Sequence, residues 1–227
     1  MGVDANGTRQ GGWLLPVGTL LAGGILILAV LLLPNLGTAP ADAQLREGRA
    51  LLESGQYDAA ITLFNQAIRQ NPADARLYFN RGLAYFSQGS YDPAIVDFTQ
   101  ALVHDPNLLL AYNNRGIAYH QQGDYEKAIS DYNQVLGREP NHTAALYNRG
   151  LAYLAAGNLS AAGADFATII ATQPDFADAY GSLGSLYAAQ GQTTAALANY
   201  RRYLELAGAN ASPAVQAYVA QFEGAGG

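Results

Sequence analysis

A 34-residue period is the feature that most constrains how this chain folds. Two glycines, an alanine and an aromatic residue recur with this step, and a proline closes the first four periods. The recurring positions are Gly48, Gly82, Gly116, Gly150 and Gly184; Gly55, Gly89, Gly123, Gly157 and Gly191; Ala60, Ala94, Ala128, Ala162 and Ala196; Phe64, Phe98, Tyr132, Phe166 and Tyr200; and Pro72, Pro106, Pro140 and Pro174. A fixed period of this length indicates a repeat architecture. Five units tile residues 41–210, with bounds 41–74, 75–108, 109–142, 143–176 and 177–210.

The spacing inside the second unit predicts its first helix. Tyr78, Gly82 and Tyr85 recur at helical spacing, and Gly89 follows them. Glycine just past a helix end adopts the left-handed conformation that side chains resist. The first helix therefore ends before Gly89.

A second helix follows in the same unit. We expect Asp92 to cap it and Pro93 to take its first position, where no amide hydrogen is needed. Pro106 ends it. The small residues Gly82 and Ala94 are expected where the two helices cross. The fold class is therefore all-α, built from antiparallel helix pairs.

Two stretches carry a family resemblance: Tyr78–Tyr85 (YFNRGLAY) and Tyr112–Tyr119 (YNNRGIAY). With their counterparts in register, they make about 170 residues of the chain resemble the tetratricopeptide repeat (TPR) family, which has a 34-residue period. The resemblance implies a superhelical solenoid of stacked helix pairs with a concave groove. It also implies that the groove, lined by the first helix of each unit, binds a segment of another protein.

The end units depart from the pattern, as the ends of a solenoid must in order to face water. Gln44 stands where Tyr78 and Tyr112 stand in later units, Thr193 takes the place of Tyr91 or Tyr125, and Gly208 replaces the closing proline. Residues 211–223 are predicted to form a capping helix that starts at Ser212-Pro213. Its apolar face is formed by Val215, Tyr218, Val219 and Phe222. A mobile tail, 224–227, is expected after it.

The N-terminal region predicts a membrane segment. After a tail at 1–12, residues 13–33 contain no charge and are long enough to span a bilayer as a helix; a linker, 34–40, follows. The favoured interpretation is a single-pass transmembrane anchor. The alternative is a long secretory signal peptide cleaved near Ala43, which would release a soluble secreted or periplasmic protein.

The orientation of this segment is not fixed by charge. Arg9 lies on one flank, and Arg46 and Arg49 lie on the other, so the positive-inside rule does not decide. The signal-like start of the chain favours repeats outside the cytoplasm.

Composition and motifs argue against several functions. The net charge is −6 with a single lysine, which disfavours nucleic-acid binding. The absence of cysteine removes thiolate chemistry. His104, His120 and His142 have no partner at a metal-binding spacing, so neither a metal nor a cofactor is expected. The repeats leave little chain for a catalytic domain, and we do not expect an enzyme.

Three middle units share a charge pattern. Each carries an arginine and, 16 residues later, an aspartate: Arg81 and Asp97, Arg115 and Asp131, Arg149 and Asp165. The first and fifth units lack both. This joint presence predicts an ion pair within each unit, between its first and second helix.

The resemblance also indicates which residues line the groove. The outward positions of the first helices are Phe79, Leu83 and Phe86; Asn113, Ile117 and His120; and Tyr147, Leu151 and Leu154, with Asn80, Asn114 and Asn148 beside them. They predict a ligand segment with apolar or aromatic anchors, whose backbone the asparagines hold. The alternative is that some of these residues pack against neighbouring helices.

These expectations together describe a membrane-anchored scaffold or adaptor that binds a protein partner. Assembly of a membrane or envelope complex is a role that suits such a protein. The released soluble form is the competing hypothesis.

Overall fold

A computed structural model describes residues 40–223, and these residues are almost entirely helical. Five helix pairs follow one another, then a short 3₁₀ turn (η1, Gly208–Asn210) and a last helix. The pairs are α1 (Pro40–Glu53) with α2 (Tyr57–Gln70), α3 (Ala75–Ser87) with α4 (Tyr91–His104), α5 (Leu109–Gln121) with α6 (Tyr125–Leu136), α7 (Thr143–Ala155) with α8 (Leu159–Thr172), and α9 (Ala177–Ala189) with α10 (Thr193–Ala207); α11 is Pro213–Glu223.

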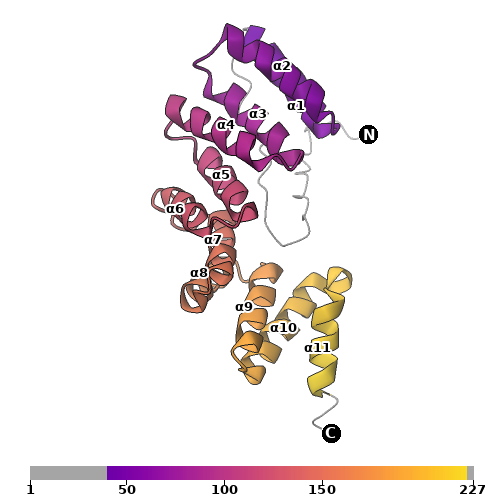
Figure 1. Cartoon of the computed structure of the whole chain (residues 1–227). Helices are drawn as coiled ribbons and strands as arrows, with labels where there is room; N and C mark the ends of the chain where they lie inside the picture. Colours follow the sequence, from indigo (N-terminus) through magenta and orange to yellow (C-terminus); the bar gives the residue numbers. More distant parts are fainter. Residues whose placement is uncertain (1–39, 224–227) are drawn as a thin grey trace, which may run out of the picture.

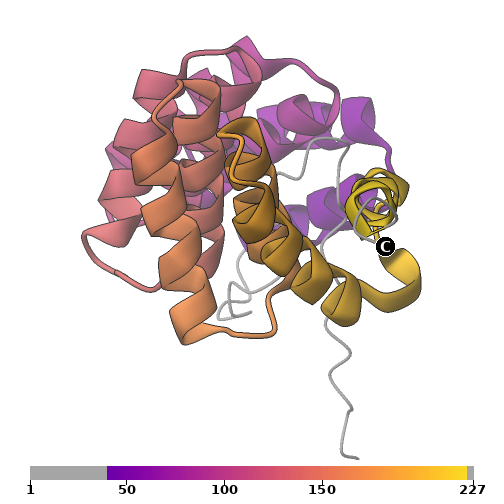
Figure 2. The same cartoon turned by 90° about the horizontal axis from the view of Figure 1, so that it is seen from below.

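Each pair packs on the next, so the molecule is a solenoid rather than a bundle. Figure 1 shows the pairs in chain order from α1 to α11, each rotated relative to the one before. Seen from below in Figure 2, the row of pairs curves instead of running straight. The predicted all-α solenoid of antiparallel helix pairs is confirmed for the described residues.

The helices of a pair cross where the sequence places glycine. A Cβ atom added at Gly82 would lie 2.8 Å from Cε1 of Phe98, and one at Gly116 would lie 2.7 Å from Cε1 of Tyr132. Both rings are fully buried. The glycine therefore lets the aromatic ring of the second helix lie against the backbone of the first.

The turn inside each pair needs a second glycine. Gly89 has a φ of 76°, and its counterparts in the other four units have φ between 71° and 80°. Side chains disfavour this left-handed conformation. The chain can therefore reverse within a few residues after each first helix.

One predicted helix boundary is wrong. The second helix of unit two begins at Tyr91 with Ser90 as its N-cap residue, so Asp92 is not the cap and Pro93 is not the first residue. Asp92 lies in the first turn, where a carboxylate favours the helix dipole. The proline is tolerated there because the first amide groups of a helix have no partner inside it.

The capping helix is confirmed at 213–223. Val219 is buried, and the Tyr218 ring packs edge-on against Tyr200 of the fifth unit with ring centroids 5.0 Å apart. Phe222 is 37% exposed but still touches Tyr218. The helix therefore covers the apolar end of the last unit.

None of the helices in residues 40–223 is both long and apolar enough to cross a bilayer. The predicted membrane segment, 13–33, lies outside the described residues, as do the tails predicted at 1–12 and 224–227.

Candidate functional site: the first-helix face

The twelve predicted groove residues lie on three successive first helices, α3, α5 and α7, which contact one another in order. We call this set the first-helix face. Leu83, Ile117 and Leu151 belong to one apolar cluster, although each comes from a different unit. The structure therefore brings residues from three repeats together in one continuous strip.

Most of the first-helix face is buried, so the packing alternative applies to much of it. Eight residues are buried: Phe79, Asn80, Phe86, Asn113, Asn114, Ile117, Tyr147 and Asn148. The other four, Leu83, His120, Leu151 and Leu154, are half-buried. These four are the part of the strip that a partner can reach without rearrangement.

The aromatic residues of this face stabilise the repeats themselves. Phe79 packs on Phe98 of its own unit, with ring centroids 5.7 Å apart. Tyr147 makes the same contact with Phe166 at 5.8 Å and also touches Phe176 at 5.6 Å. Such pairs add stabilisation beyond area burial.

Two asparagines bind the scaffold rather than solvent. The side-chain amides of Asn80 and Asn114 donate to the backbone carbonyls of Arg76 and Leu110, four residues earlier, at 2.6 and 2.8 Å. Asn80 Oδ1 also accepts from Arg49 Nε at 3.2 Å. The amide bonds lie within α3 and α5, and only the Arg49 contact joins neighbouring helices, α1 and α3.

The remaining asparagines meet across the boundary between units three and four. Asn148 Nδ2 donates to Asn113 Oδ1 at 3.4 Å. Asn113 is only 1% exposed, and its own amide nitrogen has no hydrogen-bond partner among the described residues. A buried donor without a partner costs free energy, so a ligand carbonyl that reached this nitrogen after a local rearrangement would gain a hydrogen bond.

His120, like Asn113, has buried polar side-chain atoms. Neither ring nitrogen makes a hydrogen bond of good geometry in the described part of the chain, and the ring lies edge-on to Tyr125 at 5.2 Å. Burial lowers the pKa of His120, although the Leu151 backbone is close enough to raise it in part, and the net effect favours the neutral ring. A neutral imidazole offers one donor and one acceptor.

The predicted arginine–aspartate pairs are confirmed, and all three are bidentate. Nε and Nη2 of Arg81 donate to Asp97 at 2.8 and 2.7 Å. The distances for Arg115 and Asp131 are 2.8 and 2.7 Å. For the third pair, formed by Arg149 with Asp165, they are 2.8 and 2.6 Å. The aspartate hydrogen bonds raise the pKa of each arginine, which keeps the guanidinium charged.

Each of these arginines also reaches the preceding unit, which the sequence did not indicate. The Nη1 atoms of Arg81, Arg115 and Arg149 donate to Asn65, Thr99 and Asn133. The three acceptors occupy the same repeat position but are not all the same residue type. The sequence therefore contains no repeated motif that predicts these bonds. One guanidinium therefore joins the second helices of two successive units and fixes how α3, α5 and α7 present the first-helix face.

The histidines and acidic residues of the described chain bear on the question of a metal site. No group of three or more His, Asp or Glu side chains among residues 40–223 is arranged to hold a metal ion. His142 instead acts as an N-cap, because its Nδ1 accepts from the Ala145 amide at 3.2 Å. His104 stacks on Tyr78 at 5.3 Å.

Comparison with solved structures shows that the fold is shared widely. A fragment of MamA from Desulfovibrio magneticus RS-1 is 20% identical, with a TM-score of 0.71, over 78% of this chain and 100% of that one. PilF from Pseudomonas aeruginosa is 17% identical, with a TM-score of 0.71, over 81% and 84%. TTC0263, a thermophilic TPR protein of Thermus thermophilus, is 26% identical, with a TM-score of 0.58, over 80% and 97%.

No functionally curated protein sequence matches the chain significantly. Family models do match it. A TPR repeat model covers residues 48–89 and 82–123, and tetratricopeptide repeat models cover 110–142 and 147–211. Since these matches span well over half of the sequence and coincide with the observed helix pairs, the chain belongs to the tetratricopeptide repeat family.

Proposed function

We propose that this protein is a membrane-anchored TPR adaptor that holds a segment of another protein against its first-helix face. The observation that carries the proposal is the combination of half-buried apolar side chains with polar atoms that lack partners. Leu83, Leu151 and Leu154 supply the apolar contact. Asn113 Nδ2 and the His120 ring nitrogens are buried in the described part of the chain, and they would serve as hydrogen-bonding groups only after a local rearrangement exposes them.

The chemistry of this strip defines the ligand. None of the twelve side chains carries a carboxylate, ammonium or guanidinium group. An extended or helical segment with one or two apolar anchors would bury the leucines, and its backbone carbonyl would accept from Asn113. Its affinity should depend weakly on salt, because the twelve side chains make no charge–charge contacts that salt could screen.

A matched pair of variants tests the site. Leu83→Ser with Leu151→Ser removes two half-buried anchors, whereas Val96→Ser with Val103→Ser removes two valines of α4 that are 59% and 65% exposed. Both proteins should remain helical. Partners would be captured from detergent-solubilised membranes by a photoreactive residue at the exposed position 155, next to Leu154.

A protein counts as a partner only if the leucine variant loses it and the valine variant retains it. Capture that survives in the leucine variant and fails in the valine variant would place the binding surface on α4 instead.

The membrane part of the proposal rests on residues 13–33 and on the start of α1. Asp42 is buried in the first turn and accepts from Arg76 Nη1 at 2.9 Å. Cleavage near Ala43 would remove this ion pair and the first turn of α1. This supports an uncleaved anchor over a released soluble protein.

Fractionation tests the anchor. The full chain should stay with membranes through high-salt and carbonate washes, and a chain that starts at residue 40 should be soluble and equally helical. A mature N-terminus near Ala43, found by sequencing the protein from cells, would contradict the anchor and support the secreted or periplasmic form.

A further inference from the structure

A hydrogen bond between side chains recurs where successive units meet, at the edge formed by the turns. Gln88, which follows α3, donates through Nε2 to Asp58 of α2 at 2.6 Å. Gln122, which follows α5, donates to Asp92 of α4 at 2.5 Å. In each case the glutamine stands 30 residues after the aspartate. The first two boundaries between units are therefore closed by an amide–carboxylate bridge.

The boundary between units three and four lacks this bridge. The repeat register places Glu126 at the aspartate position and Ala156 at the glutamine position. Alanine has no side-chain donor. Glu126 makes no hydrogen bond or ion pair with any other residue of the described chain and is exposed.

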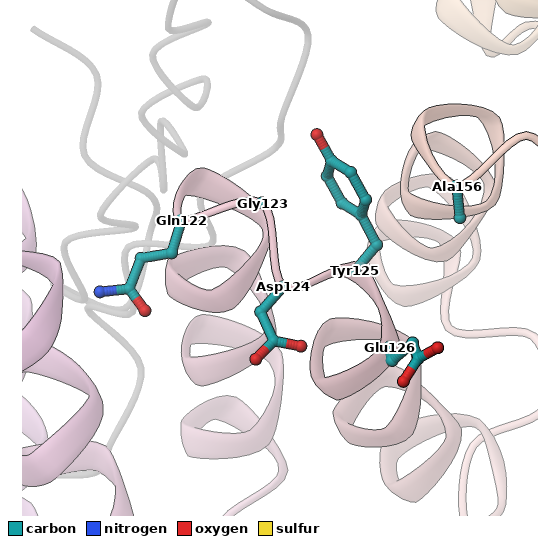
Figure 3. A pocket seen from close by; sticks show the side chains of 6 residues that line it. All are labelled: Gln122, Gly123, Asp124, Tyr125, Glu126 and Ala156. Carbon is teal, nitrogen blue, oxygen red and sulfur yellow. The ribbon is translucent and has the colours of Figure 1, made fainter.

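An open cleft of about 500 Å³ lies at this place, lined by Gln122, Gly123, Asp124, Tyr125, Glu126 and Ala156. Figure 3 shows the Tyr125 ring standing between the Gln122–Asp124 turn and the end of α7 that carries Ala156, with Glu126 on the Ala156 side of the ring. The cleft follows from the substitution of alanine for glutamine.

Only one carboxylate of the cleft is available to a ligand. Asp124 is paired with Lys127 Nζ at 2.5 Å, and the side chain of Gln122 is bound to Asp92. Glu126, the residue after Tyr125, is left without a side-chain partner in the described chain. At the two closed boundaries, a planar group with N–H donors bonds to an aspartate at the equivalent repeat position.

We propose that the cleft binds an arginine side chain of a partner protein, in the place that glutamine occupies at the two preceding boundaries. A guanidinium is planar like the amide, donates two parallel N–H bonds to one carboxylate and stacks on aromatic faces. It would bond to Glu126 and stack on Tyr125. This site lies on the turn edge of the solenoid and does not depend on the first-helix face.

The test uses the full chain in detergent and N-acetyl-arginine methylamide as the probe, followed by the amide NMR shifts of residues 123–126. The probe should cause saturable shifts. The citrulline analogue, which has the same shape without the charge, should bind at least about tenfold more weakly, since charge-assisted hydrogen bonds are roughly twice as strong as neutral ones.

Ala156→Gln should abolish the shifts, because the new side chain can form the missing bridge to Glu126. Ala155→Gln is the matched control, since it adds the same side chain at the exposed preceding residue. Glu126→Gln should also abolish binding without loss of helicity. Both Leu83 and Leu151 are intact in every variant, so failure here leaves the first-helix face untouched.

N-acetyl-lysine methylamide is tested in the same way. Shifts from the citrulline or lysine analogue equal to those from the arginine probe would overturn the proposal of an arginine site, as would binding that persists in Ala156→Gln. The absence of any saturable shift in the parent protein would overturn it as well.

Discussion

The three middle units and the two terminal units stack by different chemistry. Between middle units, one arginine bonds to an aspartate of its own unit and to a polar side chain of the preceding unit. Unit one has Glu47 and Leu63 at the arginine and aspartate positions, and unit five has Leu183 and Asn199. Unit one has no preceding unit for such an arginine to reach, whereas unit five has one and still lacks the pair.

The ends are closed by other means. At the start, Arg76 of unit two reaches back to Asp42 of unit one. At the other end, α11 covers Tyr200 with Tyr218, and the Tyr203 hydroxyl accepts from the Ser212 amide at 3.0 Å. The polar contacts thus fix the angle between repeats in the middle, and an apolar lid excludes water at the end.

The largest effect is expected from the core of a middle unit. Phe98→Ala removes a fully buried ring that fills the helix crossing beside Gly82. It should lower the free energy of unfolding by about 3–5 kcal/mol. Tyr218→Ala in the capping helix should cost clearly less, because this side chain is half-buried. Urea unfolding followed by circular dichroism measures both; an equal loss would show that the cap is as essential as the core.

The next effect concerns the polar pair. Asp131→Leu leaves the Arg115 guanidinium, whose side chain is 17% exposed, without its carboxylate. The expected loss is about 2–3 kcal/mol, since breaking a buried charge pair leaves an uncompensated charge. Adding Arg115→Leu should restore at least about 1 kcal/mol, because replacing both members by apolar groups is far less costly.

A double-mutant cycle of urea midpoints tests this coupling. The terminal units carry leucine at these positions, as Leu63 and Leu183, so the side chain fits the repeat. Strictly additive losses would show that the pair contributes no coupling.

A smaller effect is the pH dependence that His120 of unit three contributes to stability. Burial lowers the pKa of His120 in the folded state, so protons bind more readily to the unfolded chain, near about pH 6.5. The free energy of unfolding should therefore fall as pH drops from about 7.5 to about 5. His120→Gln should lose that part of the dependence. An identical pH profile in both proteins would mean that the folded protein accepts the proton at no cost.

The smallest effect is expected at the surface of the last unit. Arg202 pairs with Glu205 at 2.8 Å, and both side chains are solvent-exposed. Arg202→Ala should leave the thermal midpoint unchanged within error, because exposed pairs are weak. A clear decrease would mean that the end of the solenoid also relies on charge.

The amino-acid sequence by itself determined the number of units, their helix pairs, the crossing glycines and the arginine–aspartate pairs. These features depend on spacing within one unit, where each residue meets partners a fixed number of positions away. Asp92 shows the limit of such local reasoning. Serine and aspartate are both favoured N-cap residues, but the helix begins at Tyr91 after Ser90, whose side chain makes no capping hydrogen bond.

Only the tertiary structure decided which side chains of the first-helix face are buried, since Phe79 and Leu83 look equally apolar in the sequence. Their exposure depends on the angle between successive units, which side chains from two units set together. The same holds for the cleft at Glu126: Ala156 and Gln122 occupy equivalent positions, but the effect of the missing amide appears only where two units meet. A repeat determines its own fold through local spacing, whereas a binding surface is made from contacts between repeats.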